Sequence, residues 1–168
     1  MKLAAQLVSI CVALAIGTLA SLYLHPVEAQ APDAAPPSTE QIEPHIELAP
    51  YMTRIQTFSQ KLGYSIAGRN QPLAQFYLYE MREAVSEIVR DIPVYDNLPI
   101  DQLMVTMFYP PLKPLDTALA ASDWPAADAG YTTLINACNT CHTASLHPFI
   151  QITPASGTPP FNQKFTPN

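Results

Sequence analysis

Residues 131–142 have the sequence Tyr131-Thr-Thr-Leu-Ile-Asn-Ala-Cys-Asn-Thr-Cys-His142, which carries the strongest structural signal in the chain. Apolar residues recur in this stretch at the three-to-four spacing of one helical face, which predicts a helix. Side chains three and four residues apart on a helix share a face, so Cys138, Cys141 and His142 are expected to converge. The fold is therefore expected to present two thiols and an imidazole on one side of a helix.

The spacing C-x-x-C-H is the attachment sequence of c-type haem. The two sulfurs can form thioethers with the vinyl groups while the imidazole reaches the iron. We therefore predict one covalent haem c, attached through Cys138 and Cys141, with His142 as the proximal iron ligand. Other uses of this pattern have less support. A disulfide would close a very short loop, a thioredoxin-like pair needs a βαβ context, and a zinc site needs four ligands.

Met52 is the main candidate for the second axial ligand of the iron. In an antiparallel bundle the start of the first helix lies at the same end as the close of the last. A thioether is a suitable ligand because it favours low-spin iron and raises the reduction potential. Met104 and Met107 are the next candidates, whereas Met81 is expected in the core. A bare distal face, open to a small gas such as NO or CO, is the alternative.

Hydrophobic periodicity divides residues 46–146 into amphipathic helices joined by short connections. This pattern favours an all-α, antiparallel, up-down-up-down four-helix bundle, with the haem site between facing helices. Pro110 and Pro111 should interrupt the third helix, after a short helical piece over residues 100–108, because each removes a backbone donor. The expected helices cover residues 46–69, 71–89, 112–121 and 126–146, and the expected pocket walls are Leu48, Ile55, Leu134 and Ile135.

The segments outside the bundle have their own signatures. Residues 1–29 resemble a signal peptide, with an apolar run over residues 7–24 before Val27-Glu28-Ala29, and so predict export to the periplasm. An uncleaved anchor through residues 7–24 is the alternative and would tether the protein to a membrane. Residues 30–45 are rich in Pro and Ala and predict a flexible linker. Residues 147–168 contain five prolines and predict an extended C-terminal strap or a loose tail.

Several single residues outside the motif are also candidates for the haem site. His45 could reach a haem only if the leader folded back, and His147 is expected to be a surface or strap histidine. Tyr131, Phe149 and Phe161 could pack against haem edges, although aromatic residues on helical stripes usually belong to the core.

The charge of the chain argues against nucleic acid as a partner. The formal net charge is −6, whereas phosphate binding needs a basic surface. No catalytic triad, phosphate-binding loop or paired-carboxylate site is recognisable, so we do not expect an enzyme. The preferred interpretation is a one-electron carrier whose partners are other redox proteins.

The order of these parts, four helices with residues 131–142 on the last, resembles the class II c-type cytochromes, the cytochrome c′ family. The stretches from Lys61 to Asn70 and from Ala74 to Glu80 are also similar to small exported members. The resemblance covers residues 46–146 and implies a four-helix periplasmic cytochrome, often a homodimer. It also implies a distal Met early in the first helix, the place that Met52 occupies. The chain departs from the family in its Pro-rich tail and in the diproline.

Overall fold

The computed structural model describes residues 47–168, and all regular structure within them is helical apart from one isolated bridge. The predicted all-α class is therefore confirmed for this part of the chain. The predictions for residues 1–29, for residues 30–45 and for His45 lie outside the described residues. The elements are α1 (Ala49–Ala67), α2 (Gln71–Asp91), α3 (Ile100–Leu103), the π-helical turn η1 (Met104–Phe108), α4 (Tyr109–Ala120) and α5 (Trp124–Ala144).

Side-chain caps define where two of the long helices begin. The Asn70 side chain accepts a hydrogen bond from the backbone N–H of Leu73 at the start of α2. The Asp123 carboxylate accepts one from Ala126 N, at 3.2 Å, at the start of α5. Each cap satisfies a backbone donor that the first helical turn leaves unpaired. The cap at Asp123 explains why α5 begins at Trp124, two residues before the predicted start.

The predicted interruption of the third helix is wrong. Helical backbone runs without a break from α3 through η1 into α4, and Pro110 and Pro111 occupy the first turn of α4. A proline within an α-helix loses its own hydrogen bond and its ring meets the carbonyl four residues earlier. The wider π-helical turn directly before the diproline relieves this conflict, because its bonds span five residues instead of four.

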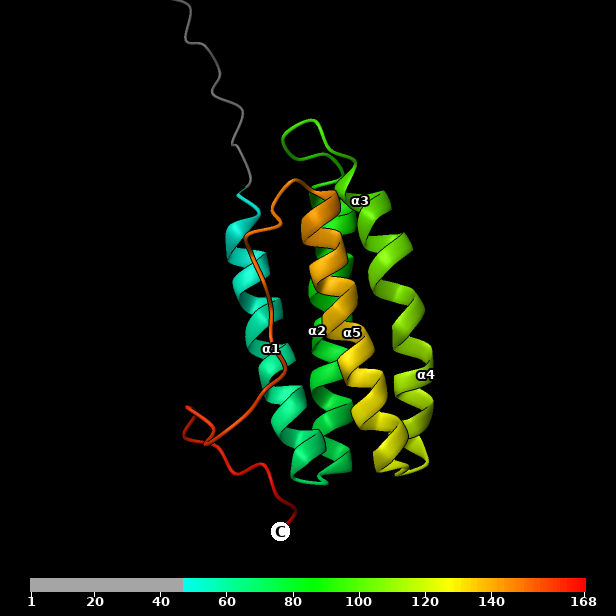
Figure 1. The fold of residues 1–168 in the computed structure, drawn as a ribbon, viewed down its shortest axis with the longest axis vertical. Coiled ribbons are helices and arrows are strands. Elements are labelled where there is room, and N and C mark those ends of the chain that lie inside the picture. The colour runs from blue at the N-terminus through cyan, green and yellow to red at the C-terminus, as the bar shows by residue number, and fades with distance from the viewer. Residues whose placement is uncertain (1–46) are drawn as a thin grey trace, which may run out of the picture. The chain divides into compact units, whose positions relative to one another are not determined.

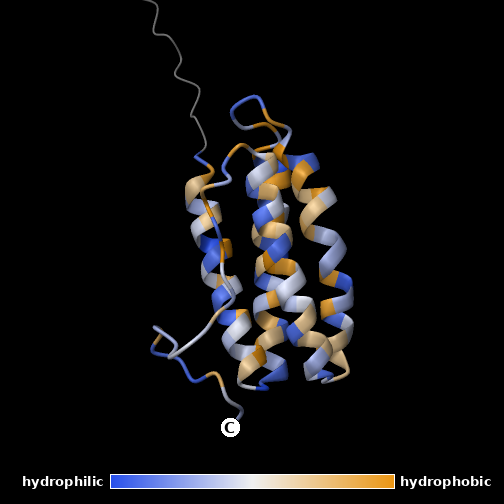
Figure 2. Ribbon diagram, in the orientation of Figure 1, coloured by the Kyte–Doolittle hydropathy of each residue, from blue (hydrophilic) through white to orange (hydrophobic). Residues whose placement is uncertain are grey.

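The four long helices lie side by side with their axes along a common direction (Figure 1). α1 contacts α2 and α5, and α4 contacts α2 and α5. Apolar and polar positions mix along each helix (Figure 2), and the apolar positions that face the neighbouring helices form one core. Burial of each large apolar side chain contributes about 1.5–3 kcal/mol. The fully buried members include Leu62, Leu78, Met81, Ile88, Leu115 and Leu134.

The C-terminal strap, residues 147–168, contains no helix or strand. Figure 1 shows it leaving the end of α5 and running back along the helices. Three tyrosines bind it. Tyr64 donates to Ser156 O at 2.9 Å, Tyr131 accepts from Ala155 N at 3.2 Å, and Tyr77 donates to Gln163 Oε1 at 2.7 Å. Within residues 47–168, no helix has the length and apolar character to cross a bilayer.

Candidate functional site

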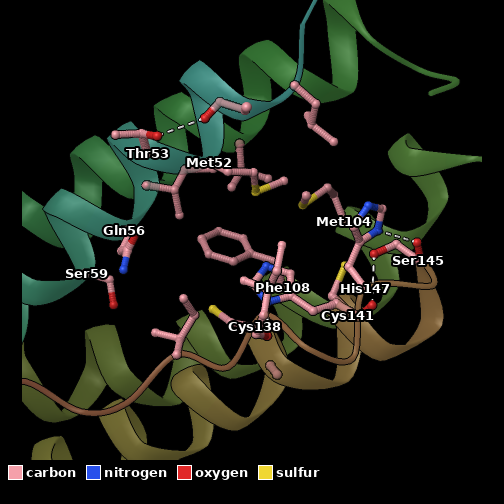
Figure 3. A pocket seen from close by; sticks show the side chains of 18 of the residues that line it. Met52, Thr53, Gln56, Ser59, Met104, Phe108, Cys138, Cys141, Ser145 and His147 are labelled. Atoms are coloured by element: carbon pink, nitrogen blue, oxygen red, sulfur yellow. Dashed lines mark hydrogen bonds between the residues drawn. The ribbon is translucent and has the colours of Figure 1, made fainter. Parts of the chain in front are cut away.

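One apolar cavity of about 360 Å³ lies between the start of α1, the turn η1 and the last turns of α5. Its size is within the range of pockets that hold small ligands. Figure 3 shows Met52 entering this space from α1, with Cys138 and Cys141 on the opposite wall. The structure thus brings together residues from the two ends of the helical region. The predicted site residues that line the cavity are Leu48, Met52, Ile55, Cys138, Cys141 and His142.

Cys138 and Cys141 are both free thiols on α5. Burial, together with the neighbouring Cys141 thiol, raises the pKa of Cys138 to about 11. Burial also raises the pKa of the Cys141 thiol. Catalytic redox thiols have lowered pKa values, because the thiolate is the nucleophile. Both cysteines are therefore protonated near neutral pH, which argues against a thioredoxin-like exchange site.

The imidazole of His142 is fixed by the C-terminal strap. Its Nδ1 lies 2.9 Å from the backbone carbonyl oxygen of Ile150. A carbonyl oxygen can only accept, so Nδ1 carries the proton and donates it to this bond. In a neutral ring this arrangement leaves the lone pair on Nε2. Nε2 is then the nitrogen of His142 that could bind a metal.

Two methionines line the same cavity from different elements. Met52 is half-buried on α1, and Met104, in η1, is only 5% exposed. Both side chains point into the cavity, beside the ring of Phe108 (Figure 3). Met107 is packed against the core and does not line the cavity. The first-ranked sequence candidate and one of the two alternatives are thus both within the site.

Two of the predicted pocket walls are elsewhere. Leu134 and Ile135 are buried in the helical core, at 0% and 2% exposure, and do not line the cavity. They share the apolar stripe of Cys138 but lie about one turn earlier on α5, whereas the cavity extends only along the last turns of that helix. Of the three candidate aromatic residues, Tyr131 is buried against the strap and Phe149 is 77% exposed. Phe161 packs against Tyr64 and does not line the cavity.

Several lining residues escaped sequence reasoning. His147, Ile150 and Ile152 of the strap line the cavity, and so do Tyr95 and Phe108. The strap has no periodic pattern from which an inward side could be predicted. His147 lies in the strap, one of the two places predicted for it, but it also lines the cavity, and its Nδ1 donates to Ser145 O at 2.6 Å.

Within residues 47–168, no three His, Cys, Asp or Glu side chains are grouped so that they could hold a bare metal ion. The chain matches no protein-family profile, and searches of the curated proteins and of the solved structures find no match either.

Proposed function

We propose that this protein is a monohaem c-type cytochrome that carries single electrons in the periplasm. We propose the fold of an antiparallel up-down-up-down four-helix bundle of the class II type. The observation that supports this most directly is the convergence of Cys138, Cys141, His142 and Met52 on one apolar cavity. Residues so far apart in sequence meet there because α1 and α5 are in contact.

The chemistry of these donors fits a c-type haem. The porphyrin already holds its iron, so the protein needs to supply only axial ligands, and a cluster of several protein ligands is not required. Cys138 and Cys141 would hold the group through thioethers, and His142 would bind the iron through its free Nε2. When bound, the haem supplies one-electron redox chemistry.

The remaining wall residues have a supporting role in this proposal. Leu48 and Ile55 line the cavity with apolar side chains, and Met52 offers a thioether from the side opposite the cysteines. An apolar surrounding and a Met/His ligand pair both raise the reduction potential. These residues would therefore set the potential at which the protein accepts and donates an electron.

The test is expression of the full chain in a host able to attach haem c. We expect an intact mass larger by one haem, and a haem that stays on the denatured chain. The Cys138→Ala/Cys141→Ala double variant should lose the covalent group. A Ser145→Ala variant, changed at another cavity residue, should keep it. Colourless wild-type protein with both thiols open to alkylation would refute the proposal.

The reduced optical spectrum distinguishes an electron carrier from a gas-binding protein. A low-spin spectrum supports the carrier, because it requires a sixth ligand from the protein. A high-spin spectrum in the wild type would contradict that role and favour reversible binding of a small gas.

The intact mass also tests export, since a cleaved chain lacks residues 1–29 and an anchored one retains them.

A further inference from the structure

The C-terminal strap meets α5 at the cysteine and histidine motif itself. His147 N donates to His142 O at 2.7 Å, and His142 Nδ1 donates to Ile150 O at 2.9 Å. Ile150 N in turn donates to His147 O at 3.0 Å. The first residues of the strap therefore fold back over the imidazole in a turn, and the Ile150 carbonyl at the end of this turn accepts a hydrogen bond from the ring.

Asn139, between the two cysteines, makes a two-point contact with the next part of the strap. Its Nδ2 donates to Ile152 O at 2.9 Å, and its Oδ1 accepts from Ile152 N at 2.7 Å. A carboxamide can donate and accept at once, so it pairs with both backbone groups of one residue. Ile152 is two residues from Ile150, so this contact restricts where the Ile150 carbonyl can lie.

We propose that Asn139 is a positioning residue for His142. It holds the Ile150 carbonyl against Nδ1 and thereby fixes the tautomer and the ring orientation of the histidine. This inference rests on the proposed function, in which Nε2 binds the iron. A carbonyl that accepts the Nδ1 proton makes the imidazole a more basic ligand. A more basic ligand favours ferric over ferrous iron, so the contact lowers the reduction potential.

The remainder of the strap has its own attachments, so loss of the Asn139 contact has a local effect. Tyr131 holds Ala155, Tyr64 holds Ser156 and Tyr77 holds Gln163. A variant without the Asn139 carboxamide is therefore expected to keep the strap on the bundle. What it loses is the register of residues 150–152 over His142.

The experiment is a redox titration of full-length, haem-loaded Asn139→Ala protein. Asn136→Ala is the matched control, because Asn136 is an exposed asparagine three residues earlier on α5 and no side-chain hydrogen bond is found for it in the described structure. Mutation of a residue that hydrogen-bonds a metal-bound histidine typically changes the affinity for the metal by about 10–100-fold. A tenfold change in the ratio of ferric to ferrous affinity corresponds to about 59 mV. We expect the reduction potential of Asn139→Ala protein to rise by about 59 mV and that of Asn136→Ala protein to match wild type.

A second pair of variants tests the same contact from the strap. Ile152→Pro removes the N–H that Asn139 accepts and should also raise the potential, whereas Ile152→Val keeps the N–H and should not. If both Asn139→Ala and Ile152→Pro carry covalent haem at the wild-type potential, the positioning role is overturned and the proposed cytochrome stands. If Asn139→Ala protein does not mature, Ile152→Pro decides in the same way. Wild-type chain without haem would overturn the proposed function itself.

Discussion

Replacing Gly63 by Ala tests how closely α1, α5 and the strap pack together. A Cβ at this position would lie 2.5 Å from Tyr131 Oη, 2.6 Å from Tyr131 Cζ and 2.7 Å from Ala155 Cβ. Carbon atoms in contact prefer separations of about 3.5–4.0 Å. Tyr131 cannot turn away freely, because it is buried and its hydroxyl accepts from Ala155 N. The added methyl must therefore displace the tyrosine, the strap or both.

Two opposing effects set the size of the change. Overpacking of a well-filled core costs about 1–3 kcal/mol, and three contacts this short put Gly63→Ala in the upper half of that range. Replacing a glycine inside a helix by alanine returns about 0.5–1 kcal/mol. The net loss in the free energy of unfolding is about 1–2.5 kcal/mol. For a urea slope of about 2 kcal/mol per molar, the midpoint should fall by about 0.5–1.2 M.

Gly130→Ala is the control for this measurement. Gly130 is also helical, on α5, but a Cβ there would meet its nearest atom, Leu115 Cδ1, at 3.2 Å. Leu115 Cβ and Cα follow at 3.3 Å and 3.4 Å, so Leu115 must shift by a few tenths of an ångström, and the helix gain offsets the cost of that shift. The free energy of unfolding of Gly130→Ala protein should stay within about 0.5 kcal/mol of wild type. A Gly63→Ala protein as stable as wild type, or more stable, would show that Tyr131 and the strap do not pack on α1 as described.

Three further predictions address the ligand, a helix cap and the pH dependence of stability. Met52→Leu keeps the side-chain volume and removes the thioether, so the low-spin reduced spectrum should disappear. Met104→Leu protein should retain that spectrum. The reverse pattern would assign the ligand to Met104. Asp123→Ala removes the α5 cap and should lower the free energy of unfolding by about 1 kcal/mol in thermal melts, and an unchanged midpoint would contradict the cap. Burial raises the pKa of Tyr131 above its ordinary 10.0, so its contribution to stability is present below that pH and lost as the pH rises through the folded-state pKa. The urea midpoint of wild type should therefore fall more between about pH 8 and about pH 11 than that of Tyr131→Phe protein. An equal fall in the two proteins would show that ionisation of Tyr131 does not affect stability.

The parts of the site that could be predicted from sequence depend on local spacing or on helix ends. Cys138, Cys141 and His142 share one face because helical geometry fixes residues three and four apart. Met52 could be placed because it lies in the first turns of α1, and the structure puts that end of α1 beside the close of α5. Both inferences needed the helices to exist but did not need their exact boundaries.

The parts that could not be predicted depend on contacts between distant segments. Sequence rules assign a break to Pro110 and Pro111, but the structure instead widens the preceding turn, and no composition signal marks a π-helical turn. Leu134 and Ile135 have the right periodicity, yet only the packing of neighbouring helices decides where along α5 the core ends and the cavity begins. Periodicity identifies the face of a helix but not the depth along it.

In the proposed cytochrome, attachment of the cofactor and control of its proximal ligand depend on different segments of the chain. A chain ending at residue 146 would retain both cysteines, His142 and Met52, which are the predicted attachment and iron-ligand residues. In such a chain the Nδ1–H of His142 would donate its hydrogen bond to water, which exchanges and does not fix the orientation of the ring. In the full chain a backbone carbonyl accepts that proton, and Asn139 restricts where the carbonyl lies. In the proposed cytochrome, attachment of the cofactor therefore belongs to the helices, whereas the electronic character of its proximal ligand depends on the segment beyond them.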